Sequence, residues 1–279
     1  MVGPLARRPL LAGALGLPWL APAAGRAQGI EAADTPRRAE RWRDLKEAIF
    51  DGRPTEPAGN ALTLVAPSRA LDAAAVPISL SLSAEAASRV RAIHLVIDEN
   101  PSPVAAVFRA GPASDLRALS ARVRVDAYTW MHAVAETADG RLLETAQFVK
   151  AAGGCSAPVG TDLRAARERM GRMRMALPEG PPTGPERAVP VQVAVSHPNT
   201  SGLQIDQLSR LNIPAEFVRA LRVLYRGAEV LRVECDISIA ENPTFGFALA
   251  GEAGGELRVE AEDNRDRRFA SAWTVGASG

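Results

Sequence analysis

Short apolar runs separated by turn-forming residues constrain the fold of this chain more than any other feature of its sequence. Between residues 61 and 149 these runs have the length of single strands, and Pro, Gly, Asn and Asp stand between them, as in Asn100-Pro101 and Asp139-Gly140. Such spacing is typical of an all-β sandwich, and Asp-Gly between two runs favours a hairpin. The candidate strands of this series are 61–65, 76–82, 90–97, 104–108, 119–125, 129–135 and 142–149.

A second series of similar runs begins at residue 189. The segment between the two series differs in composition: Gly153-Gly154 stand near its start, an arginine-rich helical stretch covers 161–172, and Pro and Gly are frequent from 178 to 185. This is the composition of a domain connection. The sequence therefore predicts an all-β protein with two immunoglobulin-like antiparallel β-sandwiches joined by a partly helical linker. The second candidate strands are 191–195, 217–225, 228–237, 245–249, 257–261 and 269–275.

Domain boundaries follow from these changes in pattern. In the charged segment 31–50, Trp42, Leu45 and Ile49 form a narrow apolar stripe at helical spacing. We expect an N-terminal helix and lead-in over 28–58, a first sandwich over 59–158, a linker over 159–177 and a second sandwich over 178–276.

The first 27 residues have the pattern of an export signal. Arg7-Arg8 precede an apolar stretch that ends at Leu20, and Ala21-Pro22-Ala23 offers small residues for cleavage. The paired arginines also fit a twin-arginine signal, so the general secretory route and the twin-arginine route both stay open. Either route leads out of the cytoplasm, and we expect the mature protein in a bacterial periplasm.

Composition excludes several classes of function. The chain has 33 Lys and Arg against 32 Asp and Glu, a formal net charge of +1, whereas general nucleic-acid binders have a strong basic excess. After residue 30 no apolar run approaches the roughly 20 residues of a membrane span. With three histidines and two cysteines, no spacing typical of a metal site is present, and no glycine-rich phosphate loop or nucleophile elbow occurs. We expect neither a metal nor a cofactor.

Cys155 is the candidate functional residue. Gly153 and Gly154 precede it, and they free the backbone of side-chain bulk. We expect an exposed arm whose thiol stays in water and can attack a disulfide or accept a sulfane sulfur. Apart from Lys150, no histidine or lysine is close in the sequence, so activation would come from a partner. The alternative is a glycine-rich interdomain turn in which the cysteine is incidental.

The other chemically interesting side chains favour structural roles. Cys235 alternates with Leu231 and Val233 on one face of a strand, so we expect it to pack as a small hydrophobe. Free thiols are favoured over a Cys155–Cys235 disulfide, which stays open as an alternative in an oxidising compartment. His94 and His132 are expected to be structural, and His197 to fix a turn. The arginines of the linker could attract anions, but a solvated helix is the favoured interpretation.

Several motifs resemble the sulfur-carrier proteins SoxY and SoxZ of bacterial thiosulfate oxidation, joined in one polypeptide. The SoxY-like motifs run from Val96-Ile97-Asp98-Glu99-Asn100-Pro101 through Val123-Arg124-Val125-Asp126 and Glu136-Thr137-Ala138-Asp139-Gly140 to Gly153-Gly154-Cys155. The SoxZ-like motifs are Ser196-His197-Pro198, Thr200-Ser201-Gly202-Leu203, Ile213-Pro214-Ala215, Ala240-Glu241-Asn242-Pro243 and Trp273-Thr274. The resemblance spans roughly 35–276, and it is closest to carriers described as quinoprotein-dehydrogenase-associated.

This resemblance implies a periplasmic sulfur carrier that is not an enzyme on its own. Cys155 would hold covalent sulfur intermediates, Gly153 and Gly154 would give its arm flexibility, and the two domains would pair with each other. The implied partners are sulfur-oxidation enzymes, c-type cytochromes or a quinoprotein dehydrogenase. One departure is clear: in SoxY the cysteine arm is a free C-terminus, whereas here Ser156-Ala157-Pro158 follow and the chain continues.

Two other functions stay open. The chain could be a non-catalytic adaptor that binds a periplasmic quinoprotein dehydrogenase system. A substrate-binding module is a third class, which the low aromatic content of 5% disfavours.

Overall fold

Alternating burial along the strands creates the two faces of each sheet. In β3 (Val76–Leu82) every second side chain, from Val76 to Leu82, is buried, and the residues between them are exposed. A strand whose sheet is covered on one face requires this period of two. The computed structural model describes residues 33–111, 114–159, 162–178, 188–207, 209–249 and 254–276. The predicted export signal at 1–27 lies outside the described residues.

In the first half of the chain, the described residues form two helices and eight strands. The helices are α1 (Pro36–Phe50) and α2 (Ala84–Ala87). Together with β3, the strands are β1 (Thr55–Pro57), β2 (Leu62–Val65), β4 (Val90–Ile97), β5 (Val104–Ala110), β6 (Ser114–Val123), β7 (Thr129–Thr137) and β8 (Leu142–Val149).

In the second half, the residues that the structure describes form one short helix, α3 (Leu163–Glu168), and seven strands. The strands are β9 (Met173–Ala176), β10 (Val189–Val195), β11 (Val218–Tyr225), β12 (Ala228–Cys235), β13 (Thr244–Leu249), β14 (Glu256–Asp263) and β15 (Arg268–Thr274).

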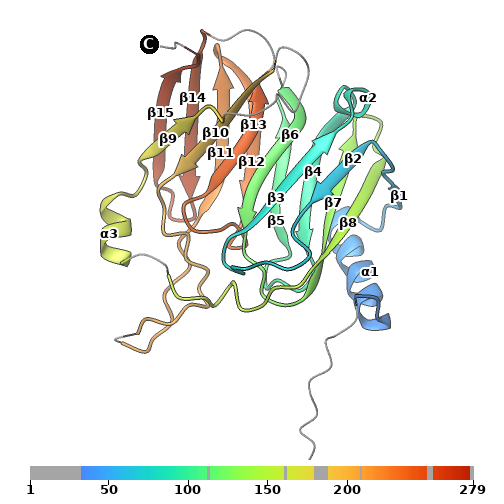
Figure 1. Cartoon of the computed structure of the whole chain (residues 1–279), viewed down its shortest axis with the longest axis horizontal. Coiled ribbons are helices and arrows are strands. Elements are labelled where there is room, and N and C mark those ends of the chain that lie inside the picture. Colours follow the sequence, from blue (N-terminus) through green and yellow to red (C-terminus); the bar gives the residue numbers. More distant parts are fainter. Residues whose placement is uncertain are drawn as a thin grey trace, which may run out of the picture. The chain divides into compact units, whose positions relative to one another are not determined.

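Both sheets run through both halves of the chain (Figure 1). The nine-stranded sheet has the order β1-β8-β7-β4-β5-β12-β11-β14-β15, and the six-stranded sheet has the order β2-β3-β6-β13-β10-β9. In each sheet the strands of the first half stand together, followed by the strands of the second half. The all-β, immunoglobulin-like fold class predicted from the sequence is confirmed, and the two sandwiches are joined edge to edge.

Two antiparallel strand pairs form this junction. β5 pairs with β12 from Ala106↔Cys235 to Ala110↔Leu231, and β6 pairs with β13 along its length. Between the sheets, the rings of Phe108 on β5 and Phe245 on β13 meet edge to face with centroids 6.3 Å apart. Because an edge strand left unpaired exposes a row of backbone groups, each half covers an open edge of the other. One apolar core extends through both halves.

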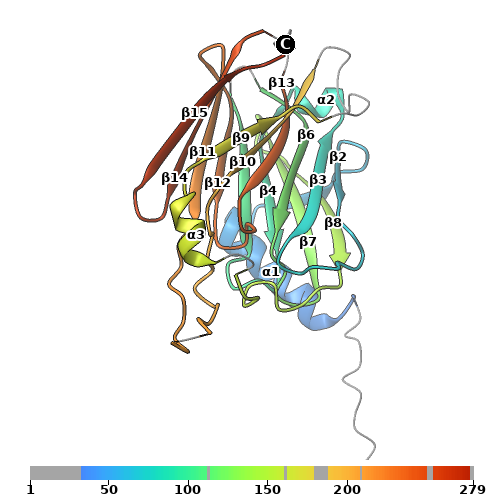
Figure 2. The same ribbon diagram turned by 60° about the vertical axis from the view of Figure 1, so that its left-hand side comes forward.

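Helix α1 covers the outer face of the nine-stranded sheet within the first half (Figures 1 and 2). Thr35 caps its N-terminus by accepting a hydrogen bond from the Arg38 N–H, Pro36 occupies its first turn, and Asp51 ends it in the left-handed region with φ 53°. Phe50 packs with Val134 and Leu142 of the sheet. Among the described residues, no helix has the length and apolar character needed to cross a bilayer.

The segment predicted as a linker contains more structure than the sequence indicated. Its helical part is α3, but β9 also falls inside 159–177 and pairs with β10 at the edge of the six-stranded sheet. Met173 and Met175 of β9 pack against the common core, which explains why this strand adds to the sheet. The exact domain boundaries stay a prediction.

The continuous core predicts that both halves unfold together. Replacing the fully buried Phe245 by Ala removes its contact with Phe108, and we expect a loss of about 3–5 kcal/mol in the free energy of unfolding. Urea unfolding followed by fluorescence checks this, with Trp42 and Trp130 reporting on the first half and Trp273 on the second. Both signals should shift to the same lower midpoint, and the fully exposed Leu71→Ala should leave it unchanged. Two separate transitions would contradict a shared core.

Candidate functional site

Cys155 is buried, which corrects the expectation of an exposed arm. Its segment leaves β8 and turns against the loop that follows β6, where the Gly153 N–H donates to the Asp126 carbonyl over 2.7 Å and the Gly154 N–H to the Val125 carbonyl over 2.9 Å. The side chain of Cys155 has 0% exposure. No local sequence pattern indicates this burial, because both contacts join residues about thirty positions apart.

The two glycines serve close packing at this point. Gly153 has φ +78°, in the left-handed region that favours glycine. A Cβ added at Gly154 would lie 2.0 Å from the Ala73 carbonyl oxygen and 2.7 Å from that of Val125. Gly154 is therefore required for the backbone to approach its neighbours and to place Cys155 inside the protein. The prediction that these glycines make the arm flexible is not tested by this packing.

The second half of the chain closes the site. The Ser201 hydroxyl donates to the carbonyl oxygen of Cys155. The carbonyl of Ile239 accepts from the Asn199 amide over 3.0 Å and also from the Arg124 guanidinium. Ser201 is 4% exposed and Asn199 is fully buried. The site thus combines both halves. Its residues Arg124, Asn199 and Ser201 were not predicted from the sequence as part of it.

Burial sets the protonation state of the Cys155 thiol. Burial in apolar surroundings raises its pKa to about 12, the nearby Asp126 carboxylate adds to this, and Arg124 acts in the opposite direction. The thiol is therefore neutral at physiological pH in this conformation. Because the thiolate is the nucleophile, the closed site protects Cys155 from reaction.

Cys235 differs from Cys155 in its surroundings. It lies on β12 opposite Ala106 of β5, partly buried against the core. Burial raises its pKa above the ordinary thiol range, with Asp236 and Glu234 adding to the effect. Both cysteines are free, as the sequence analysis favoured.

His132 lies in a buried ion-paired cluster under α1. Its Nε2 is 3.3 Å from the Asp98 carboxylate and its Nδ1 is 2.9 Å from that of Glu144. Trp42 stacks on its ring with centroids 3.7 Å apart. Burial opposes the charged imidazolium, but the two carboxylates outweigh it and raise the pKa of His132. These contacts hold α1 on the sheet.

The other two histidines are held neutral. Burial lowers the pKa of His94 and of His197, despite the nearby carboxylates of Glu136 and Asp263. The His197 Nδ1 accepts from the Asn199 N–H over 3.0 Å, and this bond shapes the turn that brings Ser201 to Cys155. Within the described ranges, no group of three or more His, Cys, Asp or Glu residues is placed to hold a metal ion.

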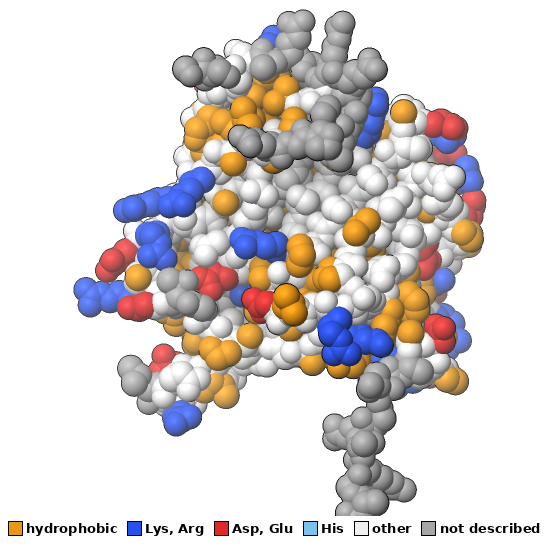
Figure 3. Space-filling model, viewed as in Figure 1, with side chains coloured by type: hydrophobic (Ala, Val, Ile, Leu, Met, Phe, Trp, Pro, Cys, Tyr) orange, Lys and Arg blue, Asp and Glu red, His pale blue; other side chains and the backbone are white. Residues whose placement is uncertain are grey.

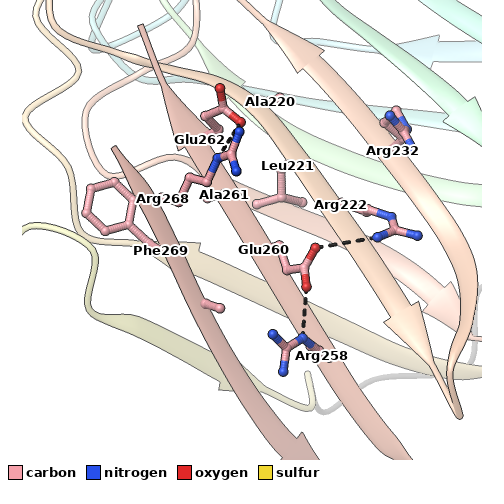
Figure 4. A pocket seen from close by; sticks show the side chains of 11 residues that line it. Ala220, Leu221, Arg222, Arg232, Arg258, Glu260, Ala261, Glu262, Arg268 and Phe269 are labelled. Carbon is pink, nitrogen blue, oxygen red and sulfur yellow. Dashed lines mark hydrogen bonds and ion pairs between the residues drawn. The ribbon is translucent and has the colours of Figure 1, made fainter. Parts of the chain in front are cut away.

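A shallow hollow of 460 Å³ lies on the outer face of β11, β12, β14 and β15, and Cys155 is not among its lining residues (Figure 4). Arginine and glutamate side chains alternate across it. Glu260 lies between Arg222 and Arg258, at 3.6 Å and 2.9 Å, and Glu262 contacts Arg268 at 3.3 Å. Such half-exposed pairs contribute little to stability.

A loop with exposed apolar side chains extends beside the Cys155 segment. It follows β10 and projects at the lower left of Figure 1, where Figure 3 shows hydrophobic side chains. Leu203, Ile205 and Leu211 are 40%, 49% and 69% exposed. The Ile213 N–H donates to the Gln204 carbonyl over 2.8 Å and closes the loop on itself. These side chains are exposed to solvent and available for contact with another protein.

Comparison with known families identifies each half separately. Residues 46–155 match the model of the sulfur oxidation protein SoxY, and residues 182–274 match that of the sulphur oxidation protein SoxZ. Cys155 is the last residue of the first match. No curated protein matches the chain significantly.

Among solved structures, the sulfur carrier protein SoxY from Chlorobium limicola f thiosulfatophilum is similar at 24% identity, with 41% of this chain and 94% of that chain covered and a TM-score of 0.35. A β-glycosidase from Bacteroides vulgatus is 8% identical, covering 77% of this chain and 24% of that one, with a TM-score of 0.22. SGBP-B of the Bacteroides ovatus mixed-linkage glucan utilization locus is 14% identical, covering 75% and 42%, with a TM-score of 0.21.

The buried thiol predicts an unusual pH profile for alkylation. Initial rates of Cys155 modification by iodoacetamide should be slow at neutral pH and keep rising toward pH about 12, because burial raises the pKa of this thiol to about 12. The same cysteine in the urea-unfolded protein should level off above the ordinary thiol pKa of about 8.5. Peptide-level mass spectrometry separates Cys155 from Cys235. A native profile that levels off near pH 9 would show that the thiol is exposed in solution.

The raised pKa of His132 predicts that its contribution to the free energy of unfolding depends on pH. Its pKa is raised in the folded protein, so its stabilising contribution is complete below the ordinary histidine pKa of about 6.5 and is lost as the pH rises through the folded value. The loss of unfolding free energy in His132→Gln should therefore be larger at about pH 5.5 than at about pH 9 in urea titrations. The control His94→Gln should show the opposite trend, because burial lowers its pKa. Equal losses for His132→Gln at both pH values would refute the assignment.

Proposed function

The chain belongs to the family of fused SoxY–SoxZ sulfur-oxidation proteins, and from this premise we propose that it is a periplasmic sulfur carrier. In this proposal Cys155 holds covalent sulfur intermediates while partner enzymes of thiosulfate or sulfur oxidation act on them. The protein is not an enzyme on its own, and it uses no cofactor besides the sulfur on Cys155. The observation that carries the proposal is the placement of Cys155 at the end of the SoxY match, in a site that both halves build.

In a carrier whose cysteine is buried, the segment around Cys155 has to open before a partner can reach the thiol. The interactions that close the site are the backbone hydrogen bonds of Gly153 and Gly154 and the Ser201 hydrogen bond to the Cys155 carbonyl. Each such bond contributes about 0.5–1.5 kcal/mol net, so local opening of this segment is accessible without unfolding the sandwiches. The closed state then shields the thiol, or the sulfur on it, between encounters with partners.

The tethered arm selects the kind of partner. The chain continues beyond Cys155 through the exposed Ser156 and Pro158, so the segment can only emerge as a loop. Partner enzymes must then receive Cys155 in an open groove, and the exposed apolar side chains of Leu203, Ile205 and Leu211 supply a contact surface beside it. Sulfur-oxidation enzymes and c-type cytochromes of the periplasm are the proposed partners.

The burial of Cys155 favours one second candidate. In that case the protein is a non-catalytic adaptor of a periplasmic quinoprotein dehydrogenase system, and Cys155 is a structural residue of the junction. An adaptor keeps its function when Cys155 is replaced by Ala, whereas a carrier loses it.

Sulfur loading tests the carrier directly. A Cys155 thiolate that attacks a central sulfur of tetrathionate forms a new S–S bond and expels thiosulfate with the electron pair of the broken bond, leaving Cys155 as an S-thiosulfonate. We expect intact-mass spectrometry to show one such adduct, removed by reductant, on wild type and on Cys235→Ala, and none on Cys155→Ala. Loading should take place at an alkaline pH that populates the thiolate. Equal loading of Cys155→Ala, or no adduct on Cys155 under any condition that leaves the protein folded, would exclude the carrier function.

A further inference from the structure

Arg124 is a cation buried at the junction of the two halves. It directly follows β6, is 2% exposed and is among the largest fully buried side chains. Its Nη1 donates to the carbonyl oxygens of Ile237, at 3.2 Å, and Ile239. Its Nε has no hydrogen-bond partner.

No carboxylate forms an ion pair with Arg124 among the described residues. Glu241 acts on Arg124 electrostatically. Burial of a charge without a paired counter-charge is strongly unfavourable. Burial accordingly lowers the pKa of Arg124 below its ordinary value, with Cys155 and Glu241 acting in the opposite direction. An arginine in this position needs an anion.

Cys155 is a nucleophilic group close enough to Arg124 to interact with it electrostatically. The Gly154 N–H bonds to the Val125 carbonyl over 2.9 Å, so the two segments run in contact just where both side chains are buried. The Ile239 carbonyl that accepts from Arg124 also accepts from Asn199, two residues before the Ser201 that bonds to Cys155. In the resting state this thiol is neutral and supplies no counter-charge, whereas a persulfide or an S-thiosulfonate is an anion at neutral pH.

We propose that Arg124 is the counter-ion for an anionic sulfur adduct on Cys155. The inference rests on the proposed carrier function and adds that the site selects a sulfur group with a negative charge. The closed site prefers a negatively charged sulfur group over the neutral thiol, so loading strengthens closure and unloading weakens it. Arg124 is a positioning residue: it holds the adduct and takes no part in bond making. Asp126, which faces the same thiol, disfavours the anion and limits this preference.

An isosteric pair of modifications measures the charge preference without a mutation at Arg124. In a Cys235→Ala background, Cys155 is alkylated in urea with iodoacetate or with iodoacetamide, and the protein is refolded. The two products have nearly the same volume, but only the carboxymethyl group is an anion. The proposal predicts that the carboxymethyl form melts at a higher temperature than the carboxamidomethyl form, by about 2–4 °C or more. Equal Tm values, or a lower Tm for the anionic form, would overturn it.

Variants of Arg124 assign the preference to this residue. Arg124→Gln should abolish the Tm difference between the two alkylated forms, and Arg124→Lys, which keeps the charge, should retain part of it. Arg122→Gln is the matched control: Arg122 lies two residues earlier, is exposed, and donates to the Thr244 hydroxyl over 3.0 Å. The Arg122→Gln variant should keep the full Tm difference between the two alkylated forms. A difference that persists in Arg124→Gln would assign the preference elsewhere and refute the proposal. If Arg124→Gln does not fold, the Tm comparison of the two alkylated forms with Arg124 in place still tests the charge preference.

Tetrathionate loading separates this inference from the carrier function. If wild-type Cys155 takes up no adduct, the carrier function fails. If Cys155 is loaded, the inference predicts that the adduct on Arg124→Gln is removed by dithiothreitol at least several-fold faster than on wild type or Arg122→Gln, because the closed state no longer retains it. Equal rates for all three proteins would leave the carrier intact and refute the role of Arg124.

Discussion

The pairing of β5 with β12 and of β6 with β13 is the constraint on which the rest of the structure depends. Each half contributes strands to both sheets, so neither half can bury its inner edges without the other. Hydrogen bonds at these edges and the Phe108–Phe245 contact between the sheets fix the relative position of the halves. The junction therefore determines where the loops of the second half meet the segment that carries Cys155.

The candidate site is a consequence of this junction. Arg124 directly follows the end of β6. The residues around Ile239 lead into β13, the strand that pairs with β6. The main chain of residues 122–124 bonds to that of Ser238 and Ala240, which covers Arg124. Ser201 then closes over Cys155 from the same half. A fused chain keeps these parts at high local concentration, so the thiol is enclosed without a partner protein.

Periodicity predicted the sheets because each strand buries alternate residues, as β3 and β14 do. The same rule fails at Arg124. Between the buried Val123 and Val125, a period of two assigns Arg124 to the solvent side, where arginine is common. The strand has ended at that point, and the loop around Ile239 buries the side chain. A contact over more than a hundred positions leaves no local pattern, so neither this cation nor the burial of Cys155 could be predicted from the sequence.

The glycines show the same limit. Gly153-Gly154 indicated an unusual backbone, which is correct, but the sequence could not distinguish a free arm from a tight contact. The Ala73 carbonyl decides the matter, because it leaves no room for a side chain at Gly154. His132 likewise was predicted to be structural, yet its two carboxylate partners and the Trp42 ring come from three separate elements. The sequence shows which residue types are present, whereas only the folded structure shows which residues contact one another.

The most direct test of the account is the chemical state of Cys155 in protein isolated without reductant from cells that are oxidising thiosulfate. Peptide mass spectrometry of that protein measures the occupancy of both cysteines. The account predicts reductant-sensitive sulfur additions on the Cys155 peptide and an unmodified Cys235. An unmodified Cys155 in cells whose thiosulfate oxidation requires this protein would contradict it.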